Sequence, residues 1–450
     1  MTPEYDFSYQ RFVFGRRSVL LLGALLPLLT AAPADASPGD VYGIGGRAIA
    51  RSGAVMVDAK GSESLHYNPS GLMETDRPEI SLGYHRAFHN LRYRSEHEGE
   101  EVAAGDAHLP ELNSLQLGLA LPIANRIALG AQLSFLPTSL TVIRTLLPEQ
   151  PYMPYFENRT ERLFFLIGAA ARLTDKLSFG LALNVFAQVN GIARASEGPT
   201  RDVEPHLSIN GRTLIRINFG FRYLFDEKQG IGFNFRQRFE APIVVQTVNA
   251  VGGVPFSVDL DARTLQSPAQ VTLGYYRAMG DFRLEGNFGW YRYSQLRAPH
   301  IEVEADLSGI PLWSGPMEEI YRDAIDLRVG GEYQLALASE HTLQLRGGVH
   351  YQSPITREAI GEANHLDGHK IGGSIGAGVR LAFPRSALRI DLYGMSTGLV
   401  GTNNVKDPEA MFDENERLAG VQTSNPGYSE IRGRGGIYAF GLTLTMELPE

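Results

Sequence analysis

The chain has 450 residues and a formal net charge of -9, with 22 Phe, 19 Tyr, 49 Gly and no Cys. The absence of Cys excludes disulfides, thiolate metal sites and cysteine nucleophiles, and the negative charge argues against a broad nucleic-acid surface. Charged residues at 20% and a mean hydropathy of -0.14 exclude a bundle of membrane-spanning helices, while an aromatic content of 10% argues against disorder.

The N-terminus carries the pattern of a secretory signal peptide. Three arginines between residues 11 and 17 precede an apolar run over 19–29, and Ala34-Asp35-Ala36 follows. A basic region, a short apolar region and an A-x-A site are the three parts of such a signal. The run is shorter than the ~20 apolar residues that a membrane helix needs. We therefore predict a signal peptide over residues 1–36, cleaved near Ala36, and an exported mature protein.

The next stretch, residues 42–72, is rich in small residues and has no long periodic pattern. Its Gly-rich run at 42–46 follows no predicted strand and lacks dinucleotide-binding spacing, so we predict no cofactor site there. Glycine permits close approach and unusual backbone angles, which suits a segment packed tightly against another part of the chain. The stretch ends in the run Asn68-Pro69-Ser70-Gly71-Leu72.

From residue 79 onward, apolar and other residues alternate with a period of two, which is typical of strands with two different faces. The pattern is sharpest from Ile215 to Phe225, where apolar residues at odd positions alternate with Arg216, Asn218, Gly220 and Arg222. We predict fourteen strands, at 79–93, 114–123, 127–136, 162–173, 177–189, 211–225, 231–245, 270–278, 282–294, 325–337, 342–351, 370–383, 387–395 and 435–448.

Two features favour a transmembrane barrel over a soluble sandwich. The apolar face carries aromatics near strand ends, as expected for girdles at the membrane interfaces; they are Tyr223, Phe225, Trp290, Tyr333 and Phe383. The opposite face is small or charged, and a soluble core could not bury such charges unpaired, whereas a water-filled lumen can hold them. The charged residues include Arg236, Arg238, Arg283, Glu285, Asp326, Arg328, Glu332, Arg389 and Asp391.

The connections between strands alternate in length. Short turns follow the even-numbered strands, at 124–126, 174–176, 226–230, 279–281, 338–341 and 384–386. Long polar or mixed loops follow the odd-numbered strands, such as 94–113, 246–269, 295–324 and 396–434. Outer-membrane barrels have short periplasmic turns and long extracellular loops, and closure removes the sheet edges that lipid does not tolerate. The sequence therefore predicts an all-β fold, a 14-stranded antiparallel transmembrane β-barrel.

The 42–72 stretch followed by fourteen strands resembles the long-chain fatty acid transporter family of outer-membrane barrels (FadL/TodX/OMPP1 type). In that family a Gly/Ala-rich hatch ending in Asn-Pro-Ala plugs the barrel. The matching residues are Gly45, Arg47, Ala48, Ser52, Gly53, Ala54, Asp58, Asn68, Pro69, Ser70, Gly71 and Leu72, with Ser70 where the family usually has Ala. The resemblance implies an N-terminal hatch over 37–78 and a barrel with long extracellular loops over 79–450.

The resemblance also implies a function: uptake of long-chain fatty acids or related hydrophobic compounds in the outer membrane of a Gram-negative bacterium. The ligand is captured by extracellular loops, passes to a site above the hatch and leaves through a lateral gap in the wall. The implied protein is a monomer and not an enzyme, without cofactor, metal or nucleic acid. Its other partners are outer-membrane lipids, lipopolysaccharide and the barrel assembly machinery.

Three long loops carry apolar clusters, which indicate either a binding surface or loops packed into a cap. The clusters are Leu146, Leu147, Tyr152, Met153, Tyr155 and Phe156; Val244, Val245, Val248, Val251, Val254, Pro255 and Phe256; and Ile310, Leu312, Trp313 and Met317. Each buried CH₂ contributes about 0.8 kcal/mol, so an apolar groove can hold an alkyl chain. We predict ligand contacts at Val254, Phe256 and Trp313. The candidate partners for a carboxylate are Arg216, Arg222, Arg236 and Arg238.

Two other functions compete with uptake. His85, His89 and His97 lie near the end of the first strand, where outer-membrane enzymes carry catalytic residues, but no compact Ser/His/Asp or paired-acid arrangement accompanies them. We therefore interpret them as solvated rim histidines. The acidic loops around 96–101 and 407–416 could hold divalent cations, although a solvated surface explains them as well. The main alternative is a related barrel that acts as a structural or secretion-associated scaffold.

Overall fold

The computed structural model describes residues 38–97, 100–106, 111–137, 151–157, 163–197, 203–251, 254–299, 301–307, 310–313, 319–359, 364–406 and 429–449. All of them fall within the unit Ala34–Glu450. The predicted signal peptide, residues 1–36, lies outside the described residues. Among the helices that the structure describes, none has the length and apolar character needed to cross a membrane.

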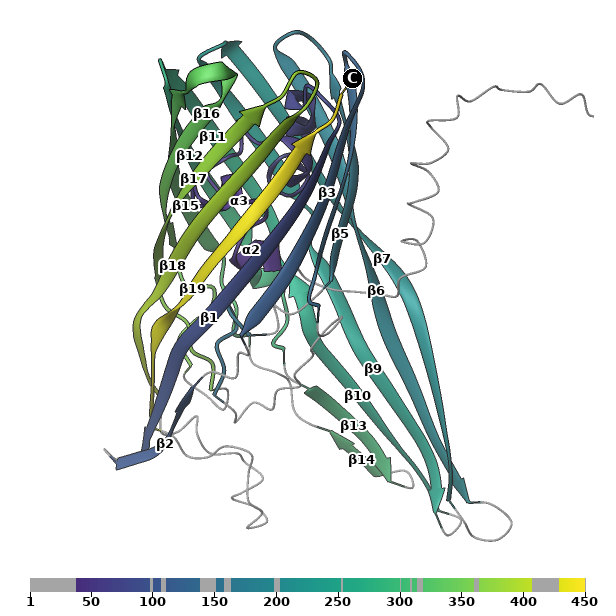
Figure 1. Cartoon of the computed structure of the whole chain (residues 1–450). Helices are drawn as coiled ribbons and strands as arrows, with labels where there is room; N and C mark the ends of the chain where they lie inside the picture. Colours follow the sequence, from purple (N-terminus) through teal and green to yellow (C-terminus); the bar gives the residue numbers. More distant parts are fainter. Residues whose placement is uncertain are drawn as a thin grey trace, which may run out of the picture. The chain divides into compact units, whose positions relative to one another are not determined.

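Fourteen antiparallel strands form a closed barrel (Figure 1). In their order around the ring they are β1 (Glu79–His97), β3 (Leu112–Ala124), β4 (Ile127–Phe135), β5 (Phe164–Arg172), β6 (Leu177–Glu197), β7 (Val203–Asp226), β8 (Gln229–Arg236), β11 (Ala269–Met279), β12 (Phe282–Arg292), β15 (Ala324–Ala336), β16 (Thr342–Gln352), β17 (Lys370–Ala382), β18 (Ala387–Val405) and β19 (Glu430–Glu447). The ring closes where β1 pairs with β19, from Glu79 opposite Glu447 to Glu96 opposite Glu430. The predicted barrel is confirmed.

The short turns predicted from the sequence are also confirmed. They connect β3 to β4, β5 to β6, β7 to β8, β11 to β12, β15 to β16, and β17 to β18. The C-terminus lies at this short-turn end of the barrel (Figure 1). Closure pairs the first strand with the last, so the wall has no open edge, as an apolar surrounding demands.

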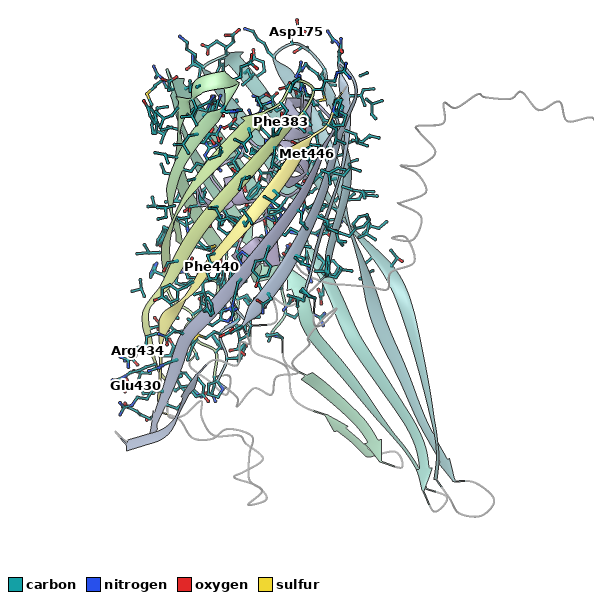
Figure 2. The ribbon with its side chains drawn as sticks, in the orientation of Figure 1. Asp175, Phe383, Glu430, Arg434, Phe440 and Met446 are labelled. Carbon is teal, nitrogen blue, oxygen red and sulfur yellow. The ribbon has the colours of Figure 1, made fainter. Side chains whose placement is uncertain are left out.

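The outside of the ring carries the apolar half of each alternating pattern. All five aromatics predicted for the girdles are exposed. Figure 2 marks three of the exposed apolar side chains, Phe383, Phe440 and Met446, on the outside of the barrel. The inward half is small, polar or charged, and Glu285, Asp326 and Asp391 are buried. An apolar exterior and a polar interior are what lipid around a barrel requires.

Of the five described strands outside the ring, four belong to one sheet: β9 (Phe239–Val251), β10 (Val254–Ser267), β13 (Ile301–Leu307) and β14 (Ile310–Trp313). Together with the far ends of β6 and β7 they form a six-stranded extension sheet in the order β7-β6-β9-β10-β13-β14 (Figure 1). In this sheet β9 pairs with β6 in parallel, although β8, which precedes it, pairs with β7. The chain therefore changes neighbours between β8 and β9. A further strand, β2 (Glu100–Asp106), pairs with the end of β1.

The predicted loops at 94–113, 246–269 and 295–324 were therefore wrong, because strands occupy much of each. The predicted single strand at 231–245 was also wrong, since β8 ends at Arg236 and β9 begins at Phe239. Local pattern favours strands here, because the run at 243–248 is rich in β-branched residues. Their partners were not visible in the sequence, because β10 pairs with β13 about forty-five residues further along.

The N-terminal residues 38–74, here called the hatch segment, lie inside the barrel (Figure 1). They form α2 (Pro38–Val41), α3 (Gly46–Ile49) and α4 (Ser64–Tyr67), with 3-10 helices at Gly61–Glu63 and Pro69–Glu74. Further 3-10 helices lie at Tyr293–Gln295 and Ala338–Glu340. Helices of four residues are not stable alone, so the wall around the hatch segment must hold it in place.

Candidate functional site

Glycines of the wall lie where the hatch segment touches it. A Cβ on Gly180 of β6 would lie 2.2 Å from the carbonyl carbon of Pro69, and one on Gly220 of β7 would lie 2.1 Å from Oδ1 of Asn68. Eight more glycines would bring a Cβ within 2.8 Å of residues 50–72: Gly118, Gly130, Gly168, Gly232, Gly274, Gly330, Gly348 and Gly376. The wall thus omits side chains where the hatch segment docks, because the two backbones approach too closely for them.

The Asn-Pro run folds the end of the hatch segment and attaches it to the wall. Nδ2 of Asn68 donates hydrogen bonds to the carbonyl oxygens of Met56 (2.8 Å) and Phe221 of β7 (3.0 Å). Its Oδ1 accepts from the backbone N–H and the hydroxyl of Ser70. A Cβ on Gly71 would lie 2.4 Å from the carbonyl oxygen of Ala59, so only glycine fits there.

The first half of the predicted hatch motif makes similar contacts with the wall. The backbone N–H of Gly45 donates to Oε1 of Gln116 on β3 (3.1 Å). Ser52 donates its N–H to the hydroxyl of Ser374 on β17 (2.7 Å), and the two hydroxyls lie 2.9 Å apart. Gly45 and Gly53 have φ angles of 77° and 73°, a region that favours glycine.

Charged side chains of the lumen pair with charges on the hatch segment. Arg47 binds Asp58, and its Nε lies 3.3 Å from Oε2 of Glu332 on β15. Arg51 is fully buried, with Nη1 2.8 Å from Oδ2 of Asp58 and Nη2 3.9 Å from Oε2 of Glu285 on β12. The sequence indicated a water-filled lumen for these charges. In the structure Glu285 and Glu332 instead pair with hatch cations, which removes much of the cost of burying these two charges.

These pairs determine the ionisation of the hatch carboxylates. Burial acts to raise the pKa of Asp58, but the cations Arg47, Lys60 and Arg51 outweigh it and hold that pKa well below its usual range. Glu63 behaves in the opposite way. Burial raises its pKa to about 7, although Arg47 acts against this shift. Within the described part of the chain, Oε1 of Glu63 has no hydrogen-bond partner.

Glu63 should make the docking of the hatch segment depend on pH. Because its folded pKa lies above its unfolded value, its contribution to stability is present at low pH and is lost as pH rises through about 7. We expect the free energy of the opening that permits hydrogen exchange at the amides of residues 61–67 to fall by about 1–2 kcal/mol between pH 6 and pH 8. The Glu63→Gln variant, which cannot ionise, should lack this change. An equal pH dependence in that variant would contradict the assignment.

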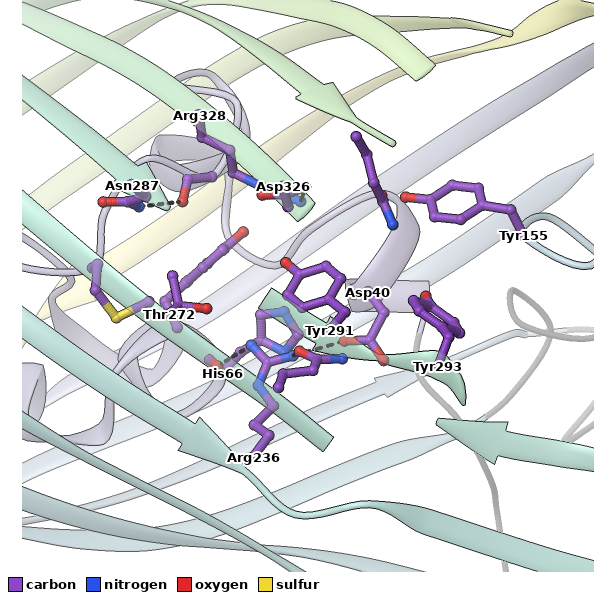
Figure 3. A pocket seen from close by; sticks show the side chains of 16 residues that line it. Asp40, His66, Tyr155, Arg236, Thr272, Asn287, Tyr291, Tyr293, Asp326 and Arg328 are labelled. Atoms are coloured by element: carbon purple, nitrogen blue, oxygen red, sulfur yellow. Dashed lines mark hydrogen bonds and ion pairs between the residues drawn. The ribbon is translucent and has the colours of Figure 1, made fainter. Parts of the chain in front are cut away.

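A small chamber lies between the hatch segment, the barrel wall and Tyr155 (Figure 3). Its volume is about 40 Å³, and two arginines line it together with tyrosines. Nη1 of Arg236 lies 2.7 Å from Oδ1 of Asp40. Arg328 makes two hydrogen bonds with Asp326, at 2.6 and 3.1 Å. Both cations therefore have a carboxylate partner, and the chamber is lined by balanced charges and aromatic rings.

Beside the chamber, which Tyr155 lines, residues 151–157 form part of a buried apolar cap. Tyr152, Met153, Tyr155 and Phe156 are all buried. The cap also contains Leu91, Tyr293, Leu296, Ile320, Tyr321, Ile355, Leu366, Leu399 and Ile431. The backbone of Tyr152 pairs with residues 364 and 366, which ties two loops together. For these four residues the cap interpretation is therefore correct, whereas Leu146, Leu147 and Met317 lie outside the described residues.

The prediction of solvated rim histidines was wrong for His85. This residue is buried inside the barrel, and its Nδ1 lies 2.7 Å from the hydroxyl of Tyr393 on β18. His89 is only partly buried, and its Nε2 forms a hydrogen bond with the hydroxyl of Tyr42 in the hatch segment. The alternation of faces along a strand could have predicted this inward position, because His85 and His89 each lie two residues from Ala87 and so share its inward face. The side chain of His97 is not described.

The four predicted carboxylate-binding arginines do not form one site. Arg222 binds Glu74 of the hatch segment, and Arg236 binds Asp40. Nε of Arg216 donates to the carbonyl oxygen of Gln237 (2.5 Å), at the break between β8 and β9. Arg238 pairs with Glu240. Of the four, only Arg236 lines the chamber.

The three predicted apolar contacts lie in the extension sheet, where strand register shows which residues share a face. Val254 pairs with Val251, and Phe256 pairs with Asn249 of β9 and Leu307 of β13. Trp313 pairs with Glu304. Paired residues share a face, so Phe256 lies on the face of Leu307, and Trp313 lies on the face of Glu304. Leu307 and Glu304 are three residues apart on β13 and therefore on opposite faces, so Trp313 is opposite to Phe256.

At the short-turn end, a cavity of about 580 Å³ is lined mainly by charged residues. They are Arg47, Lys60, Glu74, Asp76, Arg77, Glu79, Arg283, Glu332, Arg346, Arg380, Arg389 and Glu447. Apolar molecules are excluded from such surroundings because they offer no apolar contact. Among the described residues, no group of three or more His, Cys, Asp or Glu residues could hold a metal ion.

Comparison with known proteins agrees with this architecture. The crystal structure of a Pseudomonas aeruginosa FadL homologue matches with a TM-score of 0.59 and 15% identity, covering 92% of this chain and 99% of that one. The P. putida toluene transporter TodX matches with a TM-score of 0.57 and 13% identity, covering 91% and 100%. The Ralstonia pickettii toluene transporter TbuX matches with a TM-score of 0.51 and 15% identity, covering 91% and 99%.

The sequence itself places the chain in a family. A comparison with curated protein sequences found no match. A family model described as "Outer membrane protein transport protein (OMPP1/FadL/TodX)" matches residues 30–425. Since this match spans most of the chain, and the structures above share its fold, the protein belongs to the OMPP1/FadL/TodX family of outer membrane transport proteins.

Proposed function

We propose that this protein takes up long-chain fatty acids or related hydrophobic compounds across the outer membrane of a Gram-negative bacterium. The observation that carries the proposal is the extension sheet, one face of which is mostly apolar. Register places these apolar residues on that face: Val203, Pro205, Leu207 and Ile209 of β7; Ala193 and Ala195 of β6; Val245 and Val251 of β9; Val254, Phe256, Val258 and Leu260 of β10; Val303, Ala305 and Leu307 of β13; and Ile310 and Leu312 of β14. The polar residues Glu197, Thr247 and Asn249 lie among them.

The opposite face of the extension sheet is mostly polar. It holds Glu204, His206, Arg194, Gln246, Asp259, Asp261, Glu302, Glu304 and Asp306. A sheet with one apolar face must place that face against something apolar. Six strands spaced ~4.8 Å apart offer on the order of several hundred Å² of such surface, which is enough to hold an alkyl chain or a ring. We propose this face as the capture surface.

Passage through the barrel requires the hatch segment to move. The chamber of about 40 Å³ is far smaller than the ~300 Å³ or more of a typical ligand pocket. The charged cavity at the short-turn end is unfavourable for an apolar molecule, which supports exit of the ligand through the wall. Within the chamber, Arg236 is the proposed partner for a carboxylate, which would exchange with Asp40.

The proposal includes processing and surroundings. Residues 1–36 act as a signal peptide cleaved near Ala36, residues 37–78 act as the hatch, and residues 79–450 form the barrel. The exposed apolar side chains outside the ring contact outer-membrane lipids and lipopolysaccharide, and the barrel assembly machinery inserts the chain. The two toluene transporters among the similar structures support a hydrophobic substrate. Uptake needs one copy of the chain.

Uptake of a radiolabelled long-chain fatty acid tests the proposal. In the double variant Val254→Asp with Phe256→Asp, we expect the initial uptake rate to fall about tenfold or more, because a charge on the capture surface must be solvated where the alkyl chain should bind. Trp313→Asp is the matched control, since register places it on the opposite face, and it should keep most of the rate. Heat-modifiable migration in electrophoresis checks that each barrel has assembled.

A second comparison separates acids from hydrocarbons. Arg236→Ala should slow uptake of the acid more than uptake of a hydrocarbon of equal length, whereas Arg238→Ala, outside the chamber, should affect both little. If cells with and without the protein import acids, hydrocarbons and other lipids equally fast, the uptake proposal fails. The scaffold alternative would then account for the fold without a substrate.

A further inference from the structure

The aromatic ring of Tyr42, directly after α2, fills a place formed by the barrel wall. The ring lies 5.0 Å from the ring of His85 and 6.2 Å from that of His89, measured between centroids. Its hydroxyl forms a hydrogen bond with Nε2 of His89. The side chain is 3% exposed, so the barrel encloses the whole phenol group.

The described surroundings of Tyr42 include two histidines of β1 and the apolar cap in which its ring is packed. His85 and His89 share one face of β1, and the small residue Ala87 lies between them, leaving space above it. Tyr393 of β18 stacks on His85 with centroids 6.0 Å apart and holds its Nδ1. A Cβ on Gly441 would lie 2.3 Å from the hydroxyl of Tyr393, so this glycine makes room for the tyrosine.

One buried polar atom beside the ring of Tyr42 has no hydrogen-bond partner in the part of the chain that the structure describes. Nε2 of His85 is buried and has no hydrogen-bond partner among the described residues. A buried nitrogen without a partner costs about 1–3 kcal/mol. Two ring nitrogens of β1, one bonded to a hydroxyl and one unpartnered, therefore line a space of the size of one aromatic ring.

We propose that this place on the wall is a binding site for a monocyclic aromatic compound carrying a hydroxyl group, and that Tyr42 occupies it when no such compound is present. The inference rests on the proposed uptake function and names a substrate class for it. The compound replaces the phenol of Tyr42 and keeps the hydrogen bond to His89. A hydrocarbon ring without the hydroxyl loses the His89 hydrogen bond, which a buried site penalises.

Displacement of Tyr42 also gives a route from binding to movement of the hatch segment. Tyr42 follows α2, whose Asp40 binds Arg236 in the chamber. A ligand in the ring site therefore competes with one of the contacts that hold the start of the hatch segment. The same exchange would widen the chamber, since Gly39 and Asp40 line it.

Isothermal titration of the purified full-length protein in detergent tests the site, with 4-ethylphenol and ethylbenzene as probes. Tyr42→Ala removes the internal competitor, so we expect 4-ethylphenol to bind about tenfold more tightly than to the wild type, equal to about 1.4 kcal/mol. Ethylbenzene should gain roughly threefold or less. Adding His89→Ala should abolish the preference for the hydroxyl compound. Glu74→Gln breaks a different contact of the hatch segment, with Arg222, and should change neither affinity.

The site is disproved if Tyr42→Ala gains nothing for 4-ethylphenol, if ethylbenzene gains equally, or if Glu74→Gln produces the same gain. Should Tyr42→Ala fail to assemble, Tyr42→Phe decides: a gain of roughly threefold for 4-ethylphenol alone supports the site, and unchanged binding disproves it. Binding needs no transport. Fatty acid uptake without phenol binding would therefore remove only the ring site, and phenol binding without uptake of any compound would remove only the transport proposal.

Discussion

Deletion of residues 41–72 should raise the single-channel conductance of the protein in planar bilayers on the order of tenfold, because water then fills the lumen as in wide outer-membrane barrels. The hatch segment now occupies that lumen and bonds to strands around the ring, including β3, β7, β12 and β17. The wall itself should survive, since its fourteen strands pair with one another and none of those pairings involves the deleted residues.

The matched control deletes residues 244–261, which belong to the β9–β10 hairpin outside the ring. This variant should insert and conduct as the wild type does, because its hatch segment is intact. The apolar cap around residues 151–157 loses Tyr42 in the hatch deletion but keeps its other residues, so the opening is partial and the expected rise stays near tenfold. Conductance of the hatch deletion within twofold of the wild type would show that the segment is not the barrier to ions.

The Asp58→Asn substitution should release the hatch segment from the wall without removing any of its backbone. Asp58 accepts hydrogen bonds from both Arg47 and Arg51, and Arg51 has no exposed surface. Removing one partner from a buried ion pair costs about 3–5 kcal/mol, because the remaining charges stay buried. Amide exchange over residues 46–72 should therefore accelerate on the order of a hundredfold or more.

Asp175→Asn provides the comparison for that experiment. Asp175, at the short-turn end (Figure 2), pairs with Arg126 across 3.4 Å, and both side chains are exposed. Exposed pairs contribute little because water and salt screen them, so exchange throughout the protein should not change. If Asp58→Asn behaved as Asp175→Asn does, the buried network would not be what holds the hatch segment.

The sequence alone determined the barrel. A strand between lipid and a polar lumen must alternate with a period of two, so each strand records its two surroundings locally, as Ile215 to Phe225 does. Turn lengths are local as well, and they gave the strand order and the end at which the C-terminus lies. The small residues of the 42–72 stretch indicated a segment that packs closely, and its Asn68-Pro69 run does so against Gly180 and Gly220.

Only the tertiary structure decided what the inward residues do. The charges of the lumen face looked solvated, because nothing near them in sequence could neutralise them, yet Glu285 and Glu332 meet hatch cations more than two hundred residues away in sequence. His85 looked like a rim residue for the same reason. The extension sheet was missed because its pairings, such as β10 with β13, join segments whose separation no local pattern records. The two-residue period of a strand and the residues of its turns are set by neighbours along the chain. The side chains that meet across the lumen are instead brought together by closure of the ring.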